Sequence, residues 1–283
     1  MAEDMTLQEA ADHLGVHYMT AYRYVRLGLL PAEKCGVAWR VRATDVQAFR
    51  SGSTGPASPG RGAHTAPWAD RFEARVVAGD GRGAWGVVEA ALTAGMGPVE
   101  VYLDVISPAM RTVGERWAVG QLDVATEHRA SGIAMRVLGR LGPRFVRRGR
   151  TRGSVVVGAP EGEQHSLPVA MLADLLRSGG WEVSDLGCDV PPASFARVAA
   201  TSERLVAVGV SVTNPGCLPA AEITIAALRT TVGTTPILVG GRAIASAEVA
   251  ASLGADGWAP DGQMALSILD ALAASRPQDE QVG

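Results

Sequence analysis

Residues 154–167, SVVVGAPEGEQHSL, are the most informative part of the sequence, because they combine a buried strand with a polar loop at its end. The run Val155, Val156, Val157 predicts a strand at 154–159 that is covered on both faces. A helix at 168–178 follows, and Pro168 suits its first turn, where a missing N–H costs nothing. In an open parallel sheet, ligands bind outside the carboxyl ends of the strands. We therefore expect His165, in the intervening loop, to lie at a binding site.

Strand and helix patterns alternate from 154 to 275. Strands are expected at 154–159, 182–187, 205–211, 236–240 and 256–259. Helices are expected at 168–178, 192–201, 219–230, 243–253 and 262–274. Five such units predict a flavodoxin-like, doubly wound parallel sheet of order 2-1-3-4-5, with a crevice between its first and third strands. No GxGxxG sequence opens the first helix, so the dinucleotide-binding version is excluded.

Three loops should meet at this crevice. The first carries Glu163 and His165, and the loop after the third strand carries Ser211 and Thr213. The fourth strand ends in Gly240-Gly241, where the absence of side chains would let a ligand approach the backbone.

Residues 67–150 show helical periodicity, with helices expected at 68–79, 84–95, 98–117 and 123–148. A four-helix bundle is the economical packing, and Pro108 should kink the third helix. Trp117 and the pair Glu127-His128 could line one end of the bundle. By themselves, these residues are better explained as a core tryptophan and a surface pair.

Residues 5–50 predict a winged helix-turn-helix. Thr6 and Glu9 form a capping box for the first helix. A second helix is expected at about 18–27, with Ala21, Tyr24 and Val25 facing inward. A hairpin or wing is expected within 28–41. Thr44 should cap a third helix at 45–49. Residues 51–66 are rich in Gly, Ser and Pro, which is typical of a flexible linker.

The charge of this first unit favours nucleic acid. Between His17 and Arg42 there are five basic residues and one acid, although a solvated helical hairpin would also explain them. We expect four side chains of the second helix to face the major groove: Tyr18, Tyr22, Arg23 and Arg26. Arg40 or Arg42 should contact phosphate.

Bulk properties exclude several classes. The net charge of −3 argues against a general nucleic-acid binder, and Cys35, Cys188 and Cys217 match no zinc or redox spacing. No signal pattern and no apolar run long enough to span a bilayer is present, so a cytoplasmic protein with no membrane partner is expected. The expected divisions are 1–50, 51–66, 67–150, 151–276 and a tail at 277–283, which makes a multidomain chain of α and α/β classes.

Three motifs resemble known families. The pattern Glu163-x-His165, Ser211-x-Thr213 and Gly240-Gly241 resembles the cobalamin-binding domain of methionine synthase type. Trp117 followed by nine residues and Glu127-His128 is similar to the cap of cobalamin-dependent, light-responsive repressors of the CarH/LitR type. The first 45 or so residues resemble the excisionase branch of the MerR-like helix-turn-helix proteins.

The resemblance implies a role for each residue. His165 would be the lower axial ligand of the cobalt in adenosylcobalamin, and Glu163 would hydrogen-bond its other nitrogen. Ser211 and Thr213 would flank the nucleotide tail, and Gly240-Gly241 would allow it close passage. The upper face, with its adenosyl group, would be covered by four residues of the bundle: Trp117, Val124, Glu127 and His128.

Two positions depart from these families. Pro168 stands where the motif has glycine, and Ala118 stands where the best-known light-responsive relatives have a histidine. The leading expectation is a DNA-binding regulator, not an enzyme, that senses adenosylcobalamin and light and forms a dimer or tetramer on operator DNA. The alternatives are a sensor of a corrinoid or another tetrapyrrole that ignores light, a corrinoid-carrying methyltransferase subunit, and a regulator whose corrin site has decayed.

Overall fold

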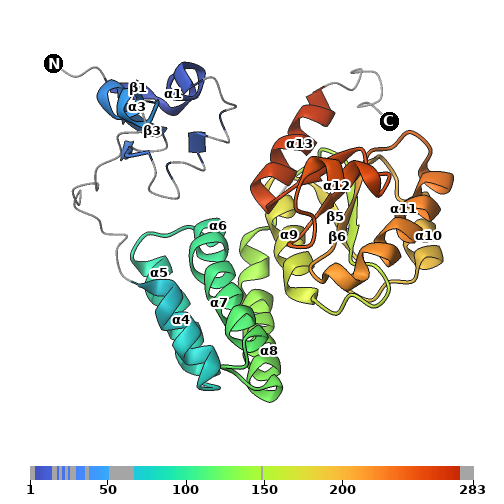
Figure 1. Ribbon diagram of the computed structural model, residues 1–283, viewed down its shortest axis with the longest axis horizontal. Helices are drawn as coiled ribbons and strands as arrows, with labels where there is room; N and C mark the ends of the chain where they lie inside the picture. Colours follow the sequence, from blue (N-terminus) through green and yellow to red (C-terminus); the bar gives the residue numbers. More distant parts are fainter. Residues whose placement is uncertain are drawn as a thin grey trace. The chain divides into compact units, whose positions relative to one another are not determined.

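The computed structural model describes residues 4–14, 18, 21–22, 25, 30–35, 38–50, 67–147 and 149–274. The chain divides into two compact units, Met1–Thr65 and Ala66–Gly283, and each is described by itself (Figure 1). In the described part of the chain, no helix combines the length and the apolar character needed to cross a membrane.

The first unit is a small three-stranded sheet with helices. Its elements are β1 (Asp4–Thr6), α1 (Leu7–Leu14), β2 (Glu33–Cys35), β3 (Ala38–Arg42) and α3 (Ala43–Arg50), with antiparallel strands in the order β1-β3-β2. The capping box is confirmed, because the Thr6 N–H donates to Glu9 at 2.7 Å and the Glu9 N–H donates to the Thr6 hydroxyl at 3.2 Å. Strand β1 was not predicted from the sequence. The expected cap at Thr44 is wrong, because α3 already begins at Ala43.

The second unit opens with a helical bundle. Its elements are α4 (Trp68–Val77), α5 (Gly81–Thr93), α6 (Pro98–Val101), η1 (Tyr102–Ile106), α7 (Ser107–Ala118) and α8 (Val124–Leu141). Helix α5 begins three residues before the predicted start, because the Asp80 carboxylate accepts the Gly83 N–H at 2.7 Å and caps it. The last helix ends at Leu141 rather than 148, since a 3₁₀ turn with Pro143 follows it.

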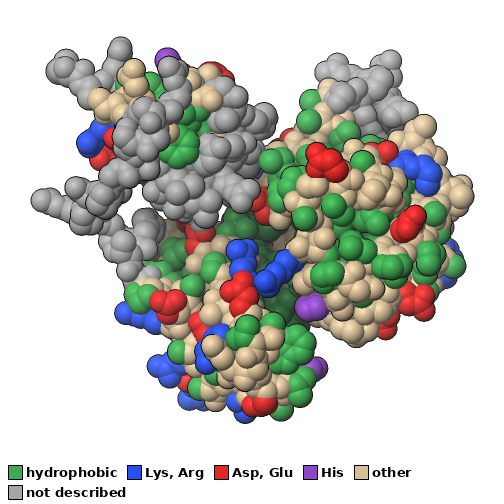
Figure 2. Space-filling model, in the orientation of Figure 1, with side chains coloured by type: hydrophobic (Ala, Val, Ile, Leu, Met, Phe, Trp, Pro, Cys, Tyr) green, Lys and Arg blue, Asp and Glu red, His purple; other side chains and the backbone are tan. Residues whose placement is uncertain are grey.

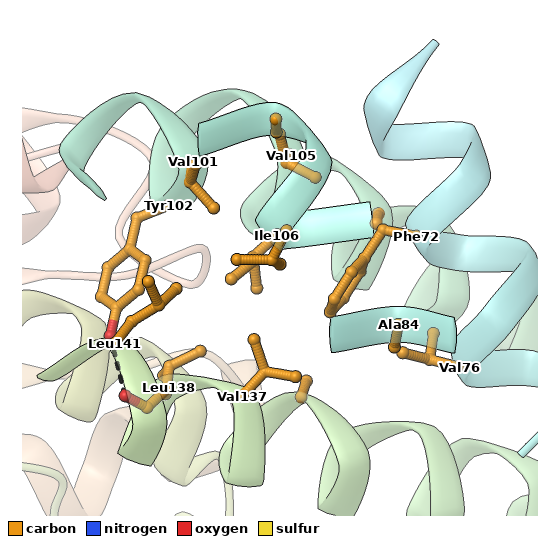
Figure 3. Close-up of a cluster of buried hydrophobic side chains, with 14 of the residues drawn as sticks. Phe72, Val76, Ala84, Val101, Tyr102, Val105, Ile106, Val137, Leu138 and Leu141 are labelled. Atoms are coloured by element: carbon orange, nitrogen blue, oxygen red, sulfur yellow. Dashed lines mark hydrogen bonds between the residues drawn. The ribbon is translucent and has the colours of Figure 1, made fainter. Parts of the chain in front are cut away.

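The third predicted helix is continuous but irregular. Its middle turn, η1, is a π-helix that directly precedes Pro108 in α7. Proline has no N–H to donate, and its ring crowds the carbonyl four residues earlier, so the preceding turn widens. Tyr102 and Ile106 of this turn lie in the bundle core with Phe72 and Leu138, as Figure 3 shows.

The rest of the unit is a five-stranded parallel sheet. Its strands are β4 (Ser154–Gly158), β5 (Glu182–Asp185), β6 (Leu205–Ser211), β7 (Ile237–Gly240) and β8 (Gly257–Ala259). The order β5-β4-β6-β7-β8 is the predicted 2-1-3-4-5, and every pairing is parallel. The doubly wound fold is therefore confirmed.

Helices cover both faces of this sheet. Helices α9 (Ser166–Ser178) and α13 (Gly262–Ala274) share one core cluster with β4. Helices α10 (Pro192–Thr201), α11 (Leu218–Val232) and α12 (Ala247–Ser252) pack on the other face. Helix α9 starts two residues before the predicted start, which leaves Pro168 in its first turn, and α12 is shorter than expected.

Candidate functional site

A single buried carboxylate organises the carboxyl edge of the sheet. Glu163, only 1% exposed, lies in the loop between β4 and α9. One of its oxygens accepts the His165 Nδ1–H at 2.5 Å and the His165 backbone N–H at 3.1 Å. The other accepts the backbone N–H groups of Thr213 at 2.8 Å and Asn214 at 2.7 Å. Glu163 therefore ties the loop after β4 to the loop after β6, which is the juxtaposition that the crevice required.

These contacts shift the pKa values of Glu163 and His165. Burial by itself would raise the pKa of Glu163, but the hydrogen bonds from His165 and from three backbone N–H groups outweigh it and lower the pKa to about 2. The carboxylate in turn raises the pKa of His165, against the opposing effect of burial. Because Nδ1 faces Glu163, Nε2 is the nitrogen left to meet a ligand. The imidazole side chain is 49% exposed.

Asp189 locks a third loop, the one after β5, and was missed from the sequence. Its carboxylate accepts the Gly162 N–H at 2.7 Å, and its own N–H donates to the Glu163 carbonyl at 2.9 Å. Its φ of +58° lies in the left-handed region, which Asp tolerates better than most residues. No sequence signal marks this position, since the contact depends on the pairing of β4 with β5.

The glycine pair after β7 has a different explanation from the predicted one. A Cβ on Gly240 would lie 2.4 Å from the Ala259 carbonyl oxygen, and one on Gly241, with a φ of +98°, would lie 2.3 Å from that of Val212. A side chain at either position would therefore collide with the backbone, so both glycines are required by the packing of the protein itself. Their role in ligand access stays a prediction. Ser211 is buried at the end of β6 and Thr213 is half-buried beyond it.

The end of the bundle presents an exposed apolar surface. Trp117, at the end of α7, is 47% exposed, and Val124, at the start of α8, is 53% exposed. Trp117 is therefore not a core residue, in contrast to the simpler explanation from sequence. Large apolar side chains left in solvent together are typical of a surface that meets a partner or ligand.

Glu127 and His128 differ in their surroundings. Glu127 accepts a hydrogen bond from Ser131 at 2.6 Å and is near enough to contribute to the raised pKa of His165. His128 is 73% exposed, and its Nδ1 hydrogen-bonds the Val124 carbonyl at 2.7 Å. The structure thus brings Glu127 toward His165 and leaves His128 on the outer side of its helix.

Two further contacts join the bundle to the sheet. Arg242, directly after the glycine pair, lies 3.5 Å from the Glu115 carboxylate on α7. Figure 2 shows acidic and basic side chains close together on the surface where the bundle meets the sheet domain. Deeper in, the Tyr102 hydroxyl donates to the Asp174 carboxylate of α9 at 2.7 Å. It also lies 3.4 Å from the Leu138 carbonyl oxygen (Figure 3). The helical bundle and the edge of the sheet that carries His165 therefore belong to one compact unit.

These residues fit a metal that brings most of its own ligands. No group of three or more His, Cys, Asp or Glu residues suited to a metal occurs among the described residues. One imidazole nitrogen, oriented by a buried carboxylate, faces the site. Such an arrangement suits a macrocyclic metal chelate that takes one axial ligand from the protein.

The predicted DNA-binding residues lie on the first unit. Tyr18 and Tyr22 stack with ring centroids 6.4 Å apart, and Tyr22 meets Trp39 edge-on at 6.5 Å. Both tyrosines pack against the core of this unit, so their rings are only partly available to a groove. Arg40 is exposed, whereas Arg42 pairs with Glu33 at 3.1 Å. Arg23, Tyr24 and Arg26 lie outside the described residues.

Family comparisons agree with this geometry. Two models, each described as a B12 binding domain, match residues 68–141 and 153–267, and a helix-turn-helix domain matches 5–53. The chain therefore carries B12-binding domains behind a helix-turn-helix head, which supports a corrinoid cofactor and a B12-binding regulator of DNA.

Individual relatives come from two classes. The chain is 34% identical to trimethylamine corrinoid protein 1 of Methanosarcina acetivorans over 40% of its own length and 54% of that protein. It is 32% identical to the HTH-type transcriptional repressor CarH of Myxococcus xanthus over 66% of its own length and 64% of that protein. The chain spans about half the length of the corrinoid proteins it matches. The structure of the Methanosarcina barkeri monomethylamine corrinoid protein shares the fold, with a TM-score of 0.64, 18% identity, and coverage of 72% of this chain and 98% of that one.

Proposed function

We propose that this protein is a transcriptional regulator, not an enzyme, that binds adenosylcobalamin between its bundle and its sheet and responds to light. The observation that carries the proposal is the Glu163–His165 pair, which holds an exposed imidazole Nε2 at the carboxyl edge of the sheet, facing the bundle residue Glu127. When bound, adenosylcobalamin supplies a light-sensitive Co–C bond.

The protein's own residues would bind and orient this group. His165 would be the axial ligand, and Glu163 would hold the imidazole in the tautomer that leaves Nε2 free. Ser211 and Thr213 would flank the nucleotide tail. Trp117 and Val124 would lose their exposure by covering the upper face.

The signal would then pass through the bundle. Trp117 would contact the bound adenosylcobalamin, so a change in that ligand would alter the position of α7 and α8 against the sheet. Assembly into a dimer or tetramer and affinity for operator DNA would follow this change.

The test is the visible spectrum of the protein reconstituted with adenosylcobalamin, before and after green light, together with a DNA mobility-shift assay. We expect a histidine-bound spectrum in the dark, a spectral change in light, and DNA binding that differs between the two states. A spectrum that shows no bound corrinoid would contradict the proposal.

A second candidate is a corrinoid sensor that ignores light. Ala118 favours it, because alanine has no donor atom that could fix a light-generated state at that position. DNA binding that depends on corrinoid but not on illumination would select this candidate. A corrinoid carrier for methyl transfer, as the Methanosarcina matches allow, would show no DNA binding in either state.

A further inference from the structure

The edge of the sheet opposite His165 carries a cluster of arginines that the proposed function does not use. We define the basic rim as four residues: Arg147, Arg150, Arg152 and Arg204. All four are exposed. They precede β4 and β6, so they lie at the amino ends of the strands, whereas His165 lies at the carboxyl ends.

The rim surrounds an open cavity. The cavity has a volume of about 360 Å³ and is lined by Arg150, Arg152, Arg204, Asp270 and the end of α13. Arg147 lies close to Arg152 outside the cavity lining, because a Cβ on Gly180 would lie 3.5 Å from Cδ of Arg152 and 4.0 Å from Cδ of Arg147. Two separate parts of the chain, residues 147–152 and Arg204, thus bring guanidinium groups to one surface.

Two of these arginines also hold the rim in place. Arg152 donates to Asp270 at 2.5 Å, and its guanidinium lies 4.6 Å above the Trp181 ring. Arg204 donates to the Thr151 carbonyl at 2.8 Å, and its φ of +52° is unusual for a residue with a side chain. Asp270 pairs with Arg152, and Glu182 and Glu203 also lie exposed at the amino ends of the strands, so the four arginines face three acids and leave an excess of one positive charge in a chain whose net charge is −3.

The chemistry of the rim suits phosphate. A guanidinium presents a planar fork of donors that matches phosphate oxygens. The side chains are exposed around an open hollow and do not converge on a buried point, which favours an extended polyanion over a small enclosed anion.

We propose that the basic rim contacts the phosphate backbone of double-stranded DNA, as a second DNA-binding surface beside the helix-turn-helix head. This inference rests on the proposed function as a DNA-binding regulator. In the head, the Arg42 guanidinium is paired with Glu33 at 3.1 Å. Phosphate contacts supply much of the affinity of such proteins, and the rim would add to them.

The test is the salt dependence of operator binding by the full chain carrying Arg147→Gln and Arg150→Gln. Each lost phosphate contact lowers the slope of log K against log salt by about 0.9, so the pair should lower it by roughly 1.8. The affinity ratio between 50 and 200 mM salt should then shrink by about 12-fold. Corrinoid affinity should stay unchanged, since the rim lies at the opposite edge from His165.

The matched control carries Arg136→Gln and Arg197→Gln, which remove the same charge from exposed positions on α8 and α10. A drop in slope for the rim pair alone supports the proposal. An unchanged slope, or an equal drop in both variants, overturns it while leaving operator binding by the head intact. Failure of the unmodified protein to bind any DNA overturns the proposed function itself. If the double variant melts at a lower temperature, Arg147→Gln alone should still lower the slope by about 0.9.

Discussion

The Tyr102 hydroxyl donates a hydrogen bond to the Asp174 carboxylate at 2.7 Å and so joins the π-helical turn of the bundle to α9 of the sheet domain. Both residues are buried, and Arg177 also donates to Asp174, at 2.9 Å. Helix α9 begins directly after His165. A buried polar contact therefore connects the middle of the bundle to the helix that follows His165.

Removal of this hydroxyl should loosen the connection. We expect Tyr102→Phe to lower the free energy of unfolding by about 1–3 kcal/mol, because the buried Asp174 loses a partner. Urea denaturation checks this. Asp174→Asn is the matched control, since it keeps an acceptor for Tyr102 but loses the charge that faces Arg177. Equal stability of Tyr102→Phe and the unmodified protein would show that the contact contributes nothing.

Glu163→Gln should weaken corrinoid binding and shift its pH dependence. Cobalt needs the free Nε2 of a neutral ring, so binding should strengthen as the pH rises through the raised pKa of His165. Without the carboxylate that pKa falls toward its ordinary value, and the midpoint should move to lower pH. The affinity at high pH should drop by about 10–100-fold through lost orientation. Spectral titration at several pH values measures both effects, and an unmoved midpoint would contradict the assigned pair.

The same pair should matter for stability in acid. The pKa of Glu163 in the folded protein, about 2, lies below its ordinary value of 4.5. The ionised Glu163 carboxylate therefore contributes its full share to the free energy of unfolding above pH 4.5, and this share is lost as the pH falls toward 2. The raised pKa of His165 has the opposite pH dependence. It stabilises the folded protein below pH 6.5, and this stabilisation is lost as the pH rises above the raised pKa. Thermal melting between pH 2 and 5 should show a smaller loss in Glu163→Gln than in the unmodified protein.

Trp117→Ala should weaken corrinoid binding while leaving the stability of the protein nearly unchanged. The ring is about half exposed without ligand, so the variant should change the free energy of unfolding by less than about 1 kcal/mol. Covering a ligand should bury it, so corrinoid affinity should fall by at least tenfold. Ile223→Ala, on an exposed apolar position of α11, is the control and should leave affinity unchanged. Equal affinities in all three proteins would remove Trp117 from the site.

Ala118→His should change the illuminated state. Alanine offers no second imidazole, and the His128 side chain is 73% exposed on the outer side of its helix. The illuminated protein should therefore lack a bis-imidazole cobalt spectrum and exchange its cobalamin faster than Ala118→His, which should gain that spectrum. A bis-imidazole spectrum in the unmodified protein that disappears in His128→Ala would refute this prediction.

Glu33→Gln should strengthen DNA binding, because it frees the Arg42 guanidinium that lies 3.1 Å from the Glu33 carboxylate. Arg42→Gln should weaken binding on all sequences and lower the salt slope by about 0.9. Fluorescence anisotropy on operator and unrelated duplexes measures both. A loss confined to the operator would mean that Arg42 reads a base.

Local features of this protein could be predicted from the amino-acid sequence. The run Val155–Val157, the capping box of Thr6 and Glu9, and the alternation of strands and helices predicted the elements and the order of the parallel sheet, because these patterns act over a few residues. The motif Glu163-x-His165 also predicted its own contact, since the two residues are only two positions apart.

Features that depend on segments distant in sequence became visible only in the folded chain. The anchor from Glu163 to the N–H groups of Thr213 and Asn214, and the lock by Asp189, exist because parallel strands bring separate loops to one edge. The reason for Gly241 is the carbonyl of Val212, directly after the neighbouring strand β6. Whether Trp117 is core or surface could not follow from periodicity, because it lies where the bundle ends and solvent begins.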